Sequence, residues 1–206
     1  MKLTAAQLQR FEAFLDRIKG ETYPEAIREP HQQITRDMIK HLCEKYPPPP
    51  AARVLDVGCG QGVALELFRQ HGLSGTGVTL NPVDAKVCVE KGFDILEMDQ
   101  SFLDFADATF DLVWCRHCIE HSFLPYFTLA EFGRVLKPNG VLYLEVPAPD
   151  TACHHERNQN HYSILGKAMW VELCKKTGFS LLEAMDINFT APAGPDTYWP
   201  MFYRKR

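Results

Sequence analysis

The stretch VLDVGCGQG at residues 54–62 decides the fold of this chain. An apolar run typical of a buried strand enters a turn with glycine at alternate positions, and a helical pattern begins at Val63. Glycine adopts positive φ and lets a ligand approach the backbone closely, and the first turn of a helix presents unpaired N–H groups. The stretch therefore predicts a ligand-binding turn between a strand and a helix.

The spacing and the charge of this turn indicate what it binds. A turn that holds the diphosphate of a dinucleotide has the spacing G-x-G-x-x-G, whereas here Val63 occupies the position of the third glycine. The carboxylate of Asp56 repels a diphosphate and attracts a sulfonium or an ammonium group. We therefore expect a positively charged amino-acid ligand. An NAD-dependent oxidoreductase is the less favoured alternative.

Strand and helix patterns alternate around this turn. Strands are predicted at residues 53–57, 75–79, 94–98, 110–115 and 141–146, with helices between them at 63–71, 83–91 and 124–136. Repeated βα units imply a mostly parallel sheet covered by helices on both faces. A last helix at 163–177 precedes two strands at 180–188 and 197–204, which a short connection makes antiparallel neighbours. The predicted fold class is α/β, a three-layer sandwich.

Two further helices are predicted before the first strand. Thr4 caps a helix that ends at Gly20, and a second helix runs from about Glu25 to Tyr46, broken or kinked by Pro30 near its start. Their apolar faces consist of Leu8, Phe11, Leu15 and Ile18 in the first helix and of Ile27, Ile34, Met38 and Leu42 in the second. Four prolines then force an extended stretch. We expect an N-terminal helical cap and proline linker at residues 1–50 and a Rossmann-like domain at 51–206.

Composition narrows the partners and the compartment. The 206 residues carry a formal net charge of −4, and the only dense basic cluster is a solvated tail at 204–206, which disfavours nucleic-acid binding. No apolar run is long enough to span a bilayer, and the N-terminus does not have the pattern of a signal peptide. The seven cysteines are scattered, which favours free thiols in a reducing compartment. We expect a cytoplasmic monomer or homodimer without stable membrane insertion.

Several stretches, in the correct order, resemble the class I S-adenosylmethionine (SAM)-dependent methyltransferases. They are the first motif at 54–62, the fourth strand at 110–114 (FDLVW), the short element at 119–121 (IEH), the turn into strand five at 134–140 (RVLKPNG) and the terminal strand at 196–204. The resemblance extends from about residue 52 to the C-terminus. It implies a seven-stranded sheet of order 3-2-1-4-5-7-6 whose last strand is antiparallel, and methyl transfer from SAM that leaves S-adenosylhomocysteine (SAH).

The resemblance also implies which residues bind the cofactor. They are Asp56, Gly58, Cys59 and Gly60 for the methionine part, Thr79 and Leu80 near the ribose, Asp99 and Gln100 for the adenine, and Cys115 facing the methionine end. Most of the family ends its second strand with a carboxylate that binds the ribose hydroxyls, but residues 77–81 (GVTLN) contain none. This segment looks more like the cyclopropane-fatty-acid-synthase branch, in which a threonine lies near the ribose. Asn81 can add a second hydrogen bond.

The loop at residues 147–163 is the expected wall of an acceptor site, because ligands of such sheets bind beyond the carboxyl ends of the strands. An acceptor hydroxyl or amine must lose a proton, for which histidine is suited. The expected general base is His161 or His155, with His161 favoured because it lies just before the last helix, and His117 is a third possibility. The expected orienting groups are Glu156, Arg157 or Tyr162. The alternative is a solvated loop whose polar residues only cap the next helix.

The expected acceptor is a small polar molecule, such as a metabolite, a sugar or a lipid-linked intermediate, methylated on oxygen or nitrogen. We expect no metal, because Cys115 and Cys118 form a single C-x-x-C pair without a second one. Tyr23, His31 and Gln32 of the N-terminal segment either cover the cofactor or serve packing alone. A non-catalytic SAM- or nucleotide-binding module is the alternative function.

Overall fold

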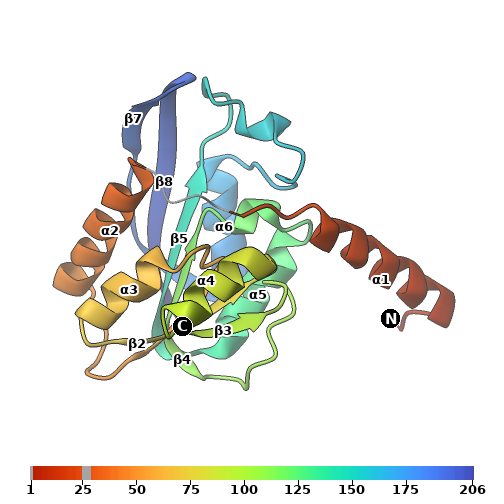
Figure 1. Ribbon diagram of the computed structural model, residues 1–206, viewed down its shortest axis with the longest axis horizontal. Coiled ribbons are helices and arrows are strands. Elements are labelled where there is room, and N and C mark those ends of the chain that lie inside the picture. Colours follow the sequence, from red (N-terminus) through yellow and green to blue (C-terminus); the bar gives the residue numbers. More distant parts are fainter. Residues whose placement is uncertain (1, 25–28) are drawn as a thin grey trace.

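Figure 1 shows the computed structural model, which describes residues 2–24 and 29–206, as a sheet with helices packed against it. The strands are β1 (Arg53–Val57), β2 (Ser74–Thr79), β3 (Asp94–Glu97), β4 (Phe110–Arg116), β5 (Leu136–Pro147), β6 (Phe179–Ala184), β7 (Ile187–Ala191) and β8 (Gly194–Lys205). Their order is β3-β2-β1-β4-β5-β8-β6, and β7 pairs with β8. Strands β1 to β5 are parallel, whereas β8 is antiparallel to β5, β6 and β7. The predicted α/β fold with its antiparallel last strand is confirmed.

Helices cover both faces of the sheet. The helices are α1 (Ala5–Gly20), α2 (His31–Lys45), α3 (Val63–Gln70), α4 (Pro82–Glu90), α5 (Pro125–Val135) and α6 (Lys167–Lys176), with short 3-10 turns η1 (Ile119–His121) and η2 (His155–Arg157). Successive residues of a strand point to opposite faces. Val54 of β1 packs with Ile39 of α2, whereas Leu55 packs with Phe132 of α5 and Trp170 of α6. No helix within the described residues has both the length and the apolar composition needed to cross a membrane.

The two N-terminal helices attach to the sheet in different ways. Thr4 caps α1, as predicted, and the helix then extends away from the sheet (Figure 1), with Ile18 as its one buried residue. Helix α2 begins at His31, and its residues Ile39 and Leu42 are fully buried against the sheet. The predicted start of the second helix, Glu25 with Ile27, lies outside the described residues. The division into parts at 1–50 and 51–206 stays a prediction.

The C-terminal part of the sheet contains one strand more than predicted. Residues 180–188 are predicted as a single strand, but β6 ends at Ala184 and β7 begins at Ile187. Strand β8 is long enough to pair with both, since Met201 lies opposite Ala184 and Tyr198 lies opposite Ile187. The two strands keep one register on β8, so the single strand predicted at 180–188 is only interrupted at residues 185–186. Here the N–H of Met185 donates to the Pro200 carbonyl at 2.9 Å, but Pro200 has no N–H to return the bond.

Candidate cofactor and acceptor site

The turn after β1 has the backbone geometry that its glycine spacing predicts. Gly58, Gly60 and Gly62 adopt φ values of 72°, 47° and 80°, in the left-handed region that favours glycine. A Cβ on Gly58 would lie 2.5 Å from Sγ of Cys118, so this position has no room for a side chain. The N–H of Gly58 donates to the Val78 carbonyl at 2.9 Å, which fixes the turn against the end of β2.

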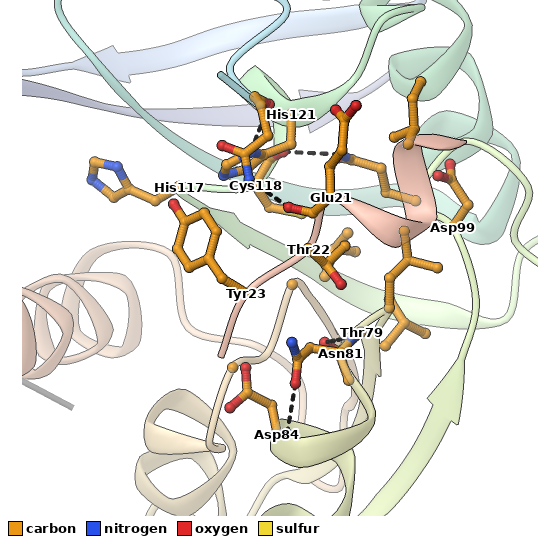
Figure 2. Close-up of a pocket in the computed structure, with 18 of the residues that line it drawn as sticks. Glu21, Thr22, Tyr23, Thr79, Asn81, Asp84, Asp99, His117, Cys118 and His121 are labelled. Atoms are coloured by element: carbon orange, nitrogen blue, oxygen red, sulfur yellow. Dashed lines mark hydrogen bonds between the residues drawn. The ribbon is translucent and has the colours of Figure 1, made fainter. Parts of the chain in front are cut away.

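A cavity with an empty volume of about 800 Å³, here called cavity A, opens beside this turn (Figure 2). Its lining includes the apolar side chains of Val57, Val78 and Met98. It also includes six of the residues predicted to bind the cofactor, namely Gly58, Gly60, Thr79, Leu80, Asp99 and Gln100. The mixed apolar and polar lining is typical of a pocket for a small organic ligand.

The residues after β3 leave a polar atom of cavity A without a partner. Gln100 Nε2 donates to the Cys118 carbonyl at 2.8 Å, which fixes the plane of the amide. The other amide atom, Oε1, is buried and has no hydrogen-bond partner among the described residues. Asp99 Oδ1 accepts from the N–H of Ser101 at 2.7 Å. Because buried polar atoms are normally hydrogen-bonded, Gln100 Oε1 is available to an N–H donor of a ligand.

A carboxylate that the sequence analysis missed lies on the β2 side of cavity A (Figure 2). Asp84, in the first turn of α4, is 2% exposed and lines the cavity. Asn81 caps this helix, because its Oδ1 accepts from the N–H groups of Val83 and Asp84 at 3.0 and 3.2 Å. Thr79 Oγ1 accepts from the N–H of Asn81 at 3.1 Å. Asp84 therefore supplies the carboxylate that the end of β2 itself does not contain.

The segment at the end of α1 forms one wall of cavity A. This segment contributes Ile18, Glu21, Thr22 and Tyr23 to the lining. Figure 2 shows it between the Thr79–Asp84 side and the His117–His121 side of the cavity. The Tyr162 hydroxyl donates to Glu21, and Asn158 Nδ2 donates to the Tyr23 hydroxyl at 3.4 Å. The N-terminal segment is thereby joined to the loop at 147–163 across the site.

A second cavity, cavity B, with an empty volume of about 1450 Å³, adjoins cavity A at the glycine turn. The residues that line both cavities are Tyr23, Gly58, Gly60, His117 and His121. Cavity B is also lined by the predicted residues Asp56, Cys59, His155 and His161, and by His31 and Gln32 of α2. The structure thus brings together all three histidines predicted for catalysis, next to the turn predicted to hold the cofactor.

A buried ion cluster lies at the carboxyl end of β4, beside cavity B. Glu145 of β5 is fully buried, accepts hydrogen bonds from Tyr143 and His117, and lies 2.8 Å from Nε of Arg116. Burial alone would raise the pKa of Glu145, but Arg116 and His117 outweigh burial and lower the pKa to about 2. The ionised carboxylate holds the guanidinium in place. Nη2 of Arg116 is buried without a hydrogen-bond partner among the described residues.

His117 lies between two carboxylates. Its Nε2 lies 3.0 Å from Glu145 Oε1, and its Nδ1 lies 3.4 Å from Glu120 Oε1. Burial lowers the pKa of His117, but the hydrogen bonds to Glu120 and Glu145 outweigh burial, so its pKa is raised. Both ring nitrogens therefore face negative charge.

The two loop histidines that line cavity B, His155 and His161, have different partners. His155 Nε2 lies 3.1 and 3.0 Å from the two carboxylate oxygens of Asp196, a residue of β8 that is 3% exposed. His161 Nδ1 donates to the His155 carbonyl at 3.0 Å, and its Nε2 lies 3.2 Å from Asn158 Nδ2. Burial lowers the pKa of His161 to about 4. His155 is thus oriented by a carboxylate and His161 by a backbone carbonyl.

The loop at 147–163 is fastened to the turn after β4. The N–H groups of Tyr162 and Ser163 donate to the Glu120 carbonyl at 2.8 and 2.9 Å. Among the predicted orienting groups, Tyr162 lines cavity A, whereas Glu156 and Arg157 are exposed and line neither cavity A nor cavity B. The loop is a wall of the site, but its charged residues face solvent.

Cys115 is placed in the core and not in the cofactor site. It is fully buried in the cluster formed with α5 and α6, and it lines neither cavity A nor cavity B. The residues of the site that the sequence analysis did not single out are Asp84, Glu120, Glu145, Asp196 and Tyr198. Glu145 carried a visible signal, since it is the one charge in the apolar run 141–146 (VLYLEV).

Comparisons with known proteins agree with this geometry. Residues 31–184 match the sequence model of a family described as a methyltransferase domain. An O-methyltransferase of Pyrenophora dematioidea is 28% identical over 181 residues, which cover 80% of this chain and 68% of that protein. The sterol 24-C-methyltransferase of Schizosaccharomyces pombe is 31% identical over 203 residues, which cover 88% of this chain and 51% of that protein.

The fold also occurs among solved structures. A protein from Galdieria sulphuraria, assigned as a sarcosine dimethylglycine methyltransferase, superposes with a TM-score of 0.74 at 18% identity and covers 94% of this chain and 97% of its own. This likeness concerns the fold alone. The match to this chain spans 68% of the length of the Pyrenophora O-methyltransferase and 51% of the length of the sterol methyltransferase. The remaining parts of those two proteins lie outside the match.

Proposed function

Because this chain belongs to the class I SAM-dependent methyltransferases, we propose that it moves a methyl group from SAM to a small polar acceptor held in cavity B. The observation that carries the proposal is the junction of two cavities at the glycine turn. One is lined by the residues after β2 and β3 that are predicted to bind the nucleoside, and the other is lined by histidines and Arg116. SAM supplies a methyl group on a positively charged sulfur, which keeps the electrons of the broken C–S bond.

The residues of cavity A and of the adjoining glycine turn fit this cofactor. Asp56 and the N–H groups at the start of α3 suit the ammonium and carboxylate groups of the methionine part. Asp84 offers acceptor oxygens to the ribose hydroxyls, and Gln100 Oε1 offers one to the adenine amine. A dinucleotide would place its diphosphate against Asp56, which disfavours the oxidoreductase alternative.

His155 is the proposed general base. Its Nε2 is held by Asp196, which leaves Nδ1 to accept the proton of an acceptor hydroxyl or amine. The acceptor atom forms its bond to the methyl carbon as the C–S bond breaks, and the proton stays on His155 until solvent removes it. Asp196 stabilises the imidazolium that forms. His161 does not have this carboxylate partner in the described structure, and both ring nitrogens of His117 already face carboxylates.

Arg116 favours an acceptor that carries an oxygen beside the reacting atom. Its buried Nη2, without a partner among the described residues, belongs to a side chain that lines cavity B. A buried guanidinium N–H requires an acceptor oxygen. We therefore propose a hydroxyl-bearing metabolite, with a second hydroxyl, carbonyl or carboxylate group, that is methylated on oxygen.

Two measurements test the proposed function. Calorimetry with SAH and with NAD⁺ should register binding of SAH only, because a dinucleotide is repelled at the glycine turn. Labelled SAM should then pass its methyl group to members of a panel of small hydroxyl, carboxyl and amine compounds. Binding of SAH without transfer to any of them would support the non-catalytic module. Label found only in tRNA or protein would exclude the proposed acceptor class.

A further inference from the structure

Three side chains that the proposed mechanism does not use converge where the two cavities meet. Glu120 and His121 belong to η1, and His161 comes from the loop at 147–163. One carboxylate oxygen of Glu120 and one ring nitrogen of each histidine all lie within 4.8 Å of one another. All three residues line cavity B, and His121 also lines cavity A. Two imidazoles and a carboxylate form a donor set typical of transition-metal sites.

Glu120 is buried in a way that calls for a positive partner. It is 1% exposed, and its Oε2 is buried without a hydrogen-bond partner among the described residues. The other oxygen, Oε1, lies 3.4 Å from His117 Nδ1, so His117 is a partner for Oε1 and not for Oε2. Buried carboxylates are normally paired or bound to metal ions. The open oxygen is therefore an independent sign of a cation at this position.

The two histidines are oriented as metal ligands are. His121 Nδ1 donates to the Asn160 carbonyl at 2.9 Å, and His161 Nδ1 donates to the His155 carbonyl at 3.0 Å. A carbonyl only accepts, so the proton of each ring belongs on Nδ1 and the lone pair on Nε2. A backbone partner on the far nitrogen is the usual outer contact of a metal-bound histidine. Asn158 Nδ2, now 3.2 Å from Nε2 of His161, would turn away.

We propose that Glu120 Oε2 and the Nε2 atoms of His121 and His161 bind a divalent transition-metal ion such as Zn²⁺ or Fe²⁺. Three protein ligands leave coordination positions open. The role of the ion rests on the proposed function: an acceptor oxygen bound at an open position loses its proton more readily. The ring centroids of His155, which also lines cavity B, and His161 lie 6.0 Å apart. Binding of the ion does not depend on that role.

A second group of similar composition is less suited to hold an ion. Cys153, His155 and Asp196 also offer ligand atoms within 4.8 Å of one another. There, however, both carboxylate oxygens of Asp196 lie within 3.1 Å of His155 Nε2, so these ligand atoms already satisfy each other. The Glu120 group retains an unpaired oxygen, which makes it the preferred site.

Cobalt binding tests the proposal without any need for activity. The full chain is treated with a chelator, dialysed and titrated with Co²⁺, and the visible absorption bands of the bound ion are recorded. We expect one equivalent to bind, and we expect Glu120→Gln and His161→Asn each to weaken binding at least tenfold. His154→Asn, in the same loop but exposed and outside the group, is the matched control and should bind as the parent does.

The outcomes separate the metal proposal from the proposed function. Calorimetry with SAH on the chelator-treated protein reports the cofactor site alone. If SAH binds but no visible bands develop, or if His161→Asn and His154→Asn bind Co²⁺ equally, the metal site is disproved while the methyltransferase proposal stands. If Glu120→Gln fails to fold, as circular dichroism would show, His161→Asn alone decides, because it changes a half-buried side chain.

Discussion

His155 Nε2 lies 3.0 Å from Oδ2 of Asp196, so a loop histidine is oriented by a carboxylate 41 residues later in the chain, on strand β8. The pair couples the wall of cavity B to the sheet. Asp196 is 3% exposed, so replacing it would disturb folding as well as function. His155 lines cavity B, so replacing it tests the function of the pair with less effect on folding.

Replacing the proposed base should stop turnover without loss of the cofactor. His155→Gln is expected to lower kcat by about 100-fold or more, since it removes the proton acceptor, and to leave the Kd for SAH within about twofold. Steady-state assays with the identified acceptor and calorimetry with SAH check this. Glu156→Gln, at the next and exposed position, is the control and should retain activity. Equal kcat for the two variants would disprove the assignment.

Asp84 should determine how tightly the ribose is held. Asp84→Ala is expected to raise the Kd for SAH by about 10- to 100-fold, as for the loss of hydrogen bonds to a charged group. Glu90→Gln, on the solvent-exposed end of the same helix, should not change it. Calorimetry compares the two. An unchanged Kd in Asp84→Ala would show that the ribose is bound from elsewhere.

Gly58 should be intolerant of a side chain for a reason beyond its backbone angle. Gly58 and Gly72 both have φ of 72°, but a Cβ on Gly58 meets Cys118 Sγ at 2.5 Å, whereas nothing lies within 4 Å of a Cβ on Gly72. Gly72→Ala should therefore cost only the left-handed strain, about 1 kcal/mol. Gly58→Ala should cost more in urea unfolding and should also abolish SAH binding. Equal losses of stability would contradict the steric argument.

Glu183 should stabilise the contact between α2 and β6 in a pH-dependent way. Hydrogen bonds from Lys45 and His41 lower the pKa of Glu183 from 4.5 to about 2, and the Tyr46 hydroxyl also donates to it. A lowered pKa means that the contribution is complete above about pH 4.5 and is lost as the pH falls towards 2.

The matching variant isolates this contribution from those of other acids. Glu183→Gln should lower the free energy of unfolding at pH 7 by about 1 kcal/mol, a modest value because the pair is partly solvated. The gap between parent and variant should narrow as urea unfolding is repeated at falling pH. A gap that is constant from pH 7 to pH 3 would show that the carboxylate charge is not responsible.

The sequence predicted those parts of the site whose residues directly follow a strand along the chain. The glycine turn, the residues after β3 and the histidine-rich loop all follow strands that composition reveals, and parallel strands bring their carboxyl ends to one edge. Asp84 was not predictable in this way, because its direction depends on how α4 leaves β2. Cys115 was assigned to the site because strand position alone does not tell which face a residue occupies near a strand end.

The buried charges were the hardest part to foresee. Glu145 and Asp196 gain their roles from Arg116 and His155, which lie on other strands or loops. Such pairing is set by the sheet order and is not encoded in spacing along the chain. The same holds for the interruption between β6 and β7, which lies opposite Pro200 of β8, a residue 15 positions further along the chain than Met185.

The contact of the N-terminal segment with cavity A has a consequence for exchange of the cofactor. Phe11 and Phe14 pack on Phe123, and Glu21 and Tyr23 are bonded to the loop on the opposite side. A nucleoside bound in cavity A would be covered on this side by Ile18, Glu21, Thr22 and Tyr23. The ring contacts of Phe11 and Phe14 with Phe123 thus help to hold this covering segment in place, and weakening them is expected to speed the release of SAH.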